Sequence, residues 1–98
     1  MPYLIKTTDK PDSAALRKST RAAHLQYIAP FASRILAGGG FLEDDGSIGN
    51  GGLIIFDTED RAEAEAFAAN DPYNLAGLFE HIEIRRWRKV ILGGKLLT

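Results

Sequence analysis

The chain has 98 residues, of which 45% are hydrophobic and 26% are charged. This is an ordinary globular composition with too little material for two separate cores, so we expect one domain over residues 1–98. The formal net charge of -1 gives no basic field for binding nucleic acid. The absence of cysteine excludes disulfides, thiolate metal sites and cysteine nucleophiles.

The sequence shows no segment of the kind that enters or crosses a membrane. No stretch approaches the roughly 20 apolar residues that span a bilayer. The N-terminus also lacks the basic segment and apolar run of a signal peptide. Together with the absence of cysteine, this favours a cytoplasmic protein with no membrane partner and no nucleic-acid partner.

The first part of the chain predicts a strand and then a long helix. Residues 2–8 contain a short apolar run rich in β-forming residues, which favours a strand. Residues 13–36 predict a helix, and Pro30 predicts a kink near Gln26 because proline removes a backbone donor. The positions that would share one side of this helix are Leu16, Thr20, Tyr27, Phe31 and Ile35.

Glycines dominate the middle of the chain. Gly38–Gly40 are expected to end the helix, because glycine readily takes the left-handed conformation at a helix C-terminus. Phe41 then begins a second strand, and residues 46–52 form a turn into a third strand at residues 53–56. We therefore expect a β-hairpin here.

The last part of the chain predicts a second helix and a fourth strand. Thr58 is expected to cap the helix, which ends before Pro72. Residues 80–91 return to a strand pattern whose phase changes around Arg85 and Arg86. The expected small-residue packing face of the helix is Ala62, Ala66 and Ala69. The order of elements is the ferredoxin-like βαββαβ arrangement of an α+β protein with an antiparallel sheet.

The third strand predicts an interface. Residues 53–56 would show apolar side chains on both faces of the sheet, whereas two helices can cover only one face. A homodimer formed through the open sheet face is the simplest cover for the other one.

His24 is the first candidate for chemistry. Helical spacing places it on the same side of the helix as Thr20, Tyr27, Ile28 and Phe31, so it points toward the core or a cleft. The structural interpretation is a buried histidine that hydrogen-bonds a carbonyl group. The functional interpretation is a general acid or base whose tautomer is fixed by a partner.

Asp71 is the candidate partner of His24. It also has a structural interpretation, as the N-cap of a short helical turn that begins with Pro72 and ends at Gly77. Arg21 lies one turn before His24, where it could bind a substrate carboxylate or pair with a surface acid. Arg17 is a similar but weaker candidate.

Other motifs favour structural roles. The basic and aromatic residues 85–89 could contact single-stranded nucleic acid, but solvated charges on a strand explain them better. The glycine-rich stretches match no nucleotide-binding fingerprint. His81 has no second ligand at metal-binding spacing, so we expect no metal and no organic cofactor.

Several of these segments together resemble the YciI-like (YCII-related) family. They are Arg21-x-x-His24-Leu25, the glycines after that helix, and Asn70-Asp71-Pro72-Tyr73 followed by Gly77 and Glu80-His81. The resemblance implies the dimeric α+β barrel type of ferredoxin-like fold, with a pocket between sheet and helices. It also implies that His24 and Asp71 form a catalytic dyad near Arg21.

These observations lead to two hypotheses. The first is a small enzyme of lyase or isomerase type, in which the His24–Asp71 dyad performs general acid/base chemistry on a small organic anion. Arg21, Tyr27 and Tyr73 are the residues expected to bind this ligand. The second is a non-catalytic dimeric module that binds a small molecule or a partner protein, with both dyad residues serving structure.

Overall fold

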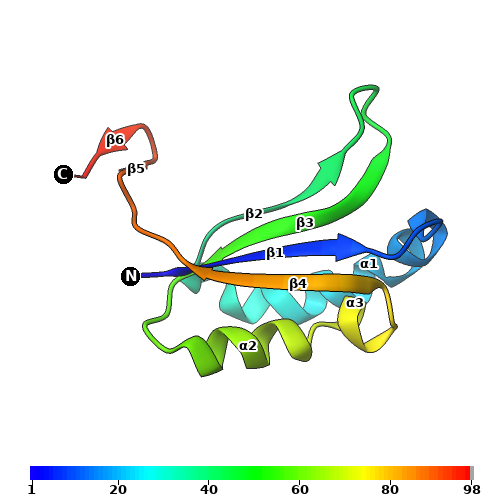
Figure 1. Cartoon of the computed structure of the whole chain (residues 1–98), viewed down its shortest axis with the longest axis horizontal. Coiled ribbons are helices and arrows are strands. Elements are labelled where there is room, and N and C mark those ends of the chain that lie inside the picture. Colours follow the sequence, from blue (N-terminus) through cyan, green and yellow to red (C-terminus); the bar gives the residue numbers. More distant parts are fainter. Residues whose placement is uncertain (98) are drawn as a thin grey trace.

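The structure, a computed structural model that describes residues 1–97, is a four-stranded sheet with its helices packed on one face (Figure 1). A short C-terminal hairpin extends from the end of the sheet. Within these residues, none of the helices has the length and hydrophobicity of a membrane span. The elements are β1 (Tyr3–Asp9), α1 (Ala14–Ile28), a 3₁₀ helix (Ala29–Arg34), β2 (Ile35–Leu42), β3 (Ile48–Phe56), α2 (Arg61–Ala69), α3 (Pro72–Leu75), β4 (Phe79–Arg86), β5 (Ile91–Leu92) and β6 (Lys95–Leu96).

The sheet has the strand order β2-β3-β1-β4, and every neighbouring pair is antiparallel. Ile5 of β1 lies between Ile54 of β3 and Ile84 of β4. The first and last of the four strands are therefore adjacent, and the sheet and helices confirm the expected ferredoxin-like α+β fold.

The core lies between the sheet and the helices. Side chains alternate across a strand, so Tyr3 and Ile5 of β1 point toward the helices. Phe56 is fully buried, and its ring stacks on that of Phe67 from α2 with centroids 4.5 Å apart. The buried core cluster is Tyr3, Ile5, Phe56, Ala64, Phe67 and Ala68.

The prediction of one kinked helix over residues 13–36 was wrong. The α-helix ends at Ile28, and Pro30 lies near the start of the 3₁₀ helix that follows. Proline fits that position because the first residues of a helix have no hydrogen-bonded N–H to lose. Phe31 and Ile35 still pack against the core, which explains why the helical spacing continued past the end of the helix.

The glycines after this helix were also misassigned. Gly38–Gly40 lie inside β2, and Phe41 lies near the end of that strand instead of beginning it. Sheet contacts do make glycine necessary on the neighbouring strand β3. A Cβ at Gly51 of β3 would lie 2.0 Å from the carbonyl oxygen of Thr7 on β1, so only glycine permits this approach of the two strands.

Asp60, not Thr58, caps α2. Its carboxylate accepts a hydrogen bond from the backbone N–H of Ala62 at 2.9 Å, while the hydroxyl of Thr58 accepts from the N–H of Asp60. The helix also buries a different face from the expected one. Its buried residues are Ala64, Phe67 and Ala68, whereas Ala62, Ala66 and Ala69 are exposed.

The predicted strand over residues 80–91 is shorter than expected. β4 ends at Arg86, where the change of phase was expected, and the backbone N–H of Trp87 donates to the carbonyl oxygen of Pro2. The irregularity in register lies elsewhere, between Thr8 and Asp9 of the neighbouring strand. The chain then leaves the sheet and forms the β5–β6 hairpin.

An ion pair between the 3₁₀ helix and α2 gives a test of stability against pH. Hydrogen bonds from Arg34 and then Thr58 lower the pKa of Glu63 from 4.5 to about 2. Because this pKa is lower in the folded state, Glu63 stabilises the protein above about pH 4.5, and that contribution is lost as the pH falls toward about 2. We expect Glu63→Gln to reduce the free energy of unfolding at neutral pH and to make its acid dependence shallower. Urea unfolding at several pH values between about 7 and 3 measures both effects.

Candidate functional site

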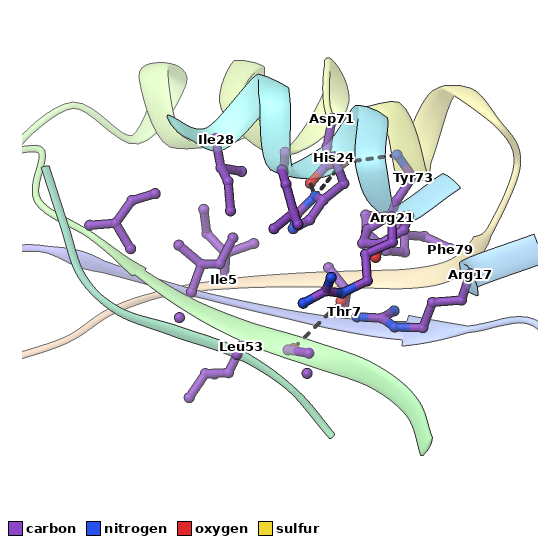
Figure 2. A pocket seen from close by; sticks show the side chains of 18 of the residues that line it. Ile5, Thr7, Arg17, Arg21, His24, Ile28, Leu53, Asp71, Tyr73 and Phe79 are labelled. Carbon is purple, nitrogen blue, oxygen red and sulfur yellow. Dashed lines mark hydrogen bonds and ion pairs between the residues drawn. The ribbon is translucent and has the colours of Figure 1, made fainter. Parts of the chain in front are cut away.

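A cavity of about 830 Å³ lies between α1 and the strands β1, β2 and β3 (Figure 2). Its apolar wall includes Ile5, Ile28 and Ile54. Its polar side chains gather at one end, where α1 faces α3 and the end of β1. A mostly apolar concave site with a few convergent polar groups is typical of small-molecule binding sites.

His24 and Asp71 meet at this cavity. The Nδ1 atom of His24 lies 2.9 and 3.0 Å from the two carboxylate oxygens of Asp71, and the side chains are 14% and 5% exposed. A carboxylate only accepts hydrogen bonds, so Nδ1 must carry the hydrogen. The neutral imidazole then has Nε2 free as a hydrogen-bond acceptor.

The local sequence around Asp71 explains why its carboxylate is fixed. Asp71 is the N-cap of α3, and its Oδ1 accepts from the backbone N–H of Tyr73 at 2.9 Å. Pro72 occupies the first helical position, where its fixed φ favours the turn. The structural interpretation of Asp71 and its contact with His24 therefore hold at the same time, because one carboxylate serves both.

Tyr73 supports the imidazole from one side. Its ring stacks on that of His24 with centroids 4.2 Å apart and an interplanar angle of 19°. Burial raises the pKa of Tyr73, and Arg17 and Arg21 oppose this only in part. The phenol thus stays protonated at neutral pH, so Tyr73 can donate a hydrogen bond but cannot act as a phenolate base there.

The two arginines of the cavity differ in their partners. Arg17 donates to both carboxylate oxygens of Asp9, at 3.0 and 2.9 Å. Arg21 also lines the cavity, and within residues 1–97 it has no acidic partner at ion-pair distance. Arg21 is consequently the guanidinium whose charge is available to an anionic ligand.

Tyr27 lies outside the cavity, unlike the other expected ligand-binding residues. Its hydroxyl donates to the backbone carbonyl of Phe67 at 2.9 Å, and its ring packs against Phe31 and Phe67. Burial, and then the charge of Asp71, raises its pKa. Tyr27 therefore serves the core, and the helical spacing that placed it beside His24 could not distinguish core from cavity.

His81 also lies apart from the site, exposed on β4. Across residues 1–97 no group of three or more His, Asp or Glu side chains could hold a metal ion.

Asp9 was missed as a site residue. In the sequence it reads as the stop of the first strand, yet it is only 5% exposed. The signal that could have identified it is the alternation along β1, which places Asp9 on the same face as Tyr3 and Ile5. A charged residue on a core face needs a partner, and Arg17 is the partner that the fold supplies.

The YCII-related domain model matches residues 1–88 of the chain. The chain belongs to this family. Protein YciI of Escherichia coli O6:H1 and that of Shigella flexneri are each 35% identical to it over 97 residues, covering 92% of this chain and 99% of the relative. The resemblance to the YCII-related family is thereby confirmed.

Solved structures extend this result to the fold. The 5-chloro-2-hydroxyhydroquinone dehydrochlorinase TftG of Burkholderia phenoliruptrix, in complex with 2,5-dihydroxybenzoquinone, is 35% identical and has a TM-score of 0.82, over 90% of this chain and 94% of TftG. An antibiotic biosynthesis monooxygenase homologue from Bacteroides thetaiotaomicron, at 14% identity and a TM-score of 0.56 over 99% of this chain and 95% of its own, is similar in fold alone. The YCII-related chain has the dimeric α+β barrel type of ferredoxin-like fold.

Proposed function

We propose that this protein is a small lyase-type enzyme that uses His24 as a general base on a planar, anionic organic substrate. One observation carries the proposal: at a mostly apolar cavity, Asp71 holds His24 through Nδ1 and leaves Nε2 free. Such a pair, with its base in reach of a ligand and its tautomer fixed, is the arrangement that general acid/base catalysis requires.

The relative TftG supports the class of substrate. It is a dehydrochlorinase whose structure holds 2,5-dihydroxybenzoquinone, a flat ring with acidic hydroxyl groups. The cavity suits such a ring, because its wall is apolar and the guanidinium of Arg21, which has no acidic partner among residues 1–97, lies at the polar end. Arg21 would bind the oxyanion of the ring, and Tyr73 would donate a hydrogen bond to it.

The reaction proposed is an elimination. In the keto tautomer of a chlorinated hydroxyhydroquinone, Nε2 of His24 accepts the proton of a ring hydroxyl. The electrons of that O–H bond form a C=O group, the adjacent ring double bond shifts, and chloride departs from the conjugated sp3 carbon with the C–Cl bonding electrons. Asp71 stabilises the imidazolium that forms, because its carboxylate remains hydrogen-bonded to Nδ1. The proton then returns to solvent, so His24 begins the next cycle as a base.

Binding of 2,5-dihydroxybenzoquinone, the quinone probe, tests this function by calorimetry. We expect saturable binding to the wild-type protein and weaker binding to His24→Gln and Arg21→Met. His81→Gln is the matched control, because His81 is the other histidine and lies outside the cavity. Equal binding by all four proteins, or none by the wild type, would contradict the proposal.

A homodimer through the open sheet face belongs to the same proposal. On that face Leu4 and Leu53 are half-buried and Ile55 is already buried within the chain, so the apolar patch is smaller than expected. Two projections nevertheless flank it: the far end of β2 and β3, and the β5–β6 hairpin, both on the side away from the helices (Figure 1). Their exposed apolar residues include Phe41, Leu42, Ile48, Val90, Ile91, Leu96 and Leu97.

Light scattering tests the dimer. At micromolar concentration we expect about twice the 10.7 kDa mass of the chain. Ile91→Lys should shift the equilibrium toward monomer, because it places a charge on the hairpin that a second copy would cover. Leu75→Lys is the control, since Leu75 is 72% exposed on α3, at the helical side. A wild-type monomer would remove the dimer from the proposal.

The second candidate function is a non-catalytic binding module. The close stacking of the Tyr73 ring on the His24 ring favours this module, because stacked rings of this kind can serve packing alone. This module would bind the quinone probe without turning over any chlorinated hydroxyhydroquinone. In both cases we propose a single cytoplasmic domain.

A further inference from the structure

The side chains that hold His24 form a series of contacts that extends beyond Asp71. The imidazole stacks on Tyr73, and the guanidinium of Arg17 lies over the same tyrosine, with Cζ 4.7 Å from the ring centroid. Arg17 is held in turn by Asp9, whose two oxygens both accept from Nη1. Contacts thus run without a break from Asp9 at the end of β1 to the imidazole on α1. Figure 2 labels Arg17, Tyr73 and His24 of this series.

Burial and packing restrict the movement of these side chains. The side chains of Arg17 and Asp9 are only 13% and 3% exposed. On the sheet side Arg17 lies against Gly40 and Gly52, where an added Cβ would be 3.4 and 3.3 Å from its Nη2 atom. The sheet therefore has no side chain where the guanidinium lies, and the guanidinium itself fills that space.

We propose that Arg17 is a positioning residue for the dyad: anchored by Asp9, its guanidinium holds the Tyr73 ring against His24 and so fixes the direction of Nε2. Asp71 alone fixes one atom of the imidazole, and a ring held at one atom can still swing about that hydrogen bond. A second contact on the ring face removes this freedom. This role rests on the proposed function, in which Arg21 and not Arg17 binds the anion.

The proposal depends on the planar shape of arginine. A guanidinium lies flat on an aromatic face while one of its nitrogens binds a carboxylate, whereas an ammonium group is a compact charge that cannot do both in the same place. Arg17→Lys therefore keeps the positive charge beside Asp9 and removes the guanidinium that lies over the Tyr73 ring. The buried carboxylate is not left unpaired, so the variant is expected to fold.

The experiment is an NMR comparison of the His24 ring signals in the free protein. Stacking on Tyr73 shifts these signals, and Tyr73→Leu shows their position without the stack. We expect Arg17→Lys to move them toward the Tyr73→Leu position and to weaken binding of the quinone probe by roughly two- to fivefold. Tyr73→Phe, which keeps the aromatic ring, should leave the stack in place.

Arg34→Lys is the matched control. Arg34 also pairs with an acid, Glu63, and its Cζ also lies 4.8 Å over an aromatic ring, that of Phe56, but it does not line the cavity. Its His24 signals should match the wild type. Unmoved His24 signals in Arg17→Lys would overturn the positioning role, and weaker probe binding without such a movement would show instead that Arg17 contacts the ligand. If the wild type fails to bind the probe, the proposed function fails, while the His24 signals still decide the role of Arg17.

Discussion

Arg17→Met is expected to lower the free energy of unfolding by about 3–5 kcal/mol. The change leaves the carboxylate of Asp9 in a nearly dry site without the guanidinium that compensates its charge. A single buried and uncompensated charge destabilises a protein far more than the intact pair stabilises it, because the carboxylate loses its water on folding and gains nothing in return. Urea unfolding monitored by circular dichroism measures the effect.

Two further variants separate this cause from a general loss of packing. Arg34→Met breaks a pair whose side chains are each 41% exposed, so it should lower the free energy of unfolding far less than Arg17→Met does. The double change Asp9→Leu with Arg17→Met should recover much of the stability lost in Arg17→Met, because no buried charge remains. Equal losses in Arg17→Met and Arg34→Met would contradict a buried, strongly coupled pair.

His24→Gln is expected to lower turnover by about 10²–10⁴-fold, the usual contribution of a positioned general base. Glutamine keeps a polar side chain of similar size but cannot accept and release the proton. Asp71→Asn should also lower turnover, because an amide no longer favours the tautomer with hydrogen on Nδ1 or stabilises the imidazolium. Release of chloride from a chlorinated hydroxyhydroquinone is the assay.

These variants are expected to stay folded, so a loss of turnover can be assigned to the chemistry of the dyad. In Asp71→Asn the amide oxygen can still accept from the N–H of Tyr73, so the cap of α3 and the fold should be retained. His81→Gln should turn over substrate like the wild type, because His81 lies outside the cavity. A His24→Gln protein with full activity would show that His24 is not the base, whereas no turnover by the wild type would leave the non-catalytic module as the better account.

The class of fold could be predicted from local patterns in the sequence. The order of elements was predictable because apolar spacing changes clearly between period two and helical period along the chain. The end of the first helix was not predictable, since Phe31 and Ile35 continue the helical spacing of apolar residues beyond Ile28. The strand role of Gly38–Gly40 was also hidden, because glycine reads as a turn unless the neighbouring strands are known.

The candidate site was predictable only where chain neighbours define it. Asp71 could be placed because Pro72 sets its turn, and His24 because of its position on the helix. The pairing of Arg17 with Asp9 joins a strand end to a helix, and its contact with Tyr73 joins both to α3. No spacing in the sequence encodes such a contact, since it exists only after the helices pack on the sheet.

Nitrogen-15 NMR of the His24 ring tests the central claim most directly. At a pH where the ring is neutral, the expected spectrum has hydrogen on Nδ1 and none on Nε2, because Asp71 accepts from Nδ1. Addition of the quinone probe should then shift the Nε2 signal, while the His81 signals stay in place. A neutral ring with hydrogen on Nε2, or an Nε2 signal that does not respond to saturating probe, would contradict the claim that His24 is held as a base facing its ligand.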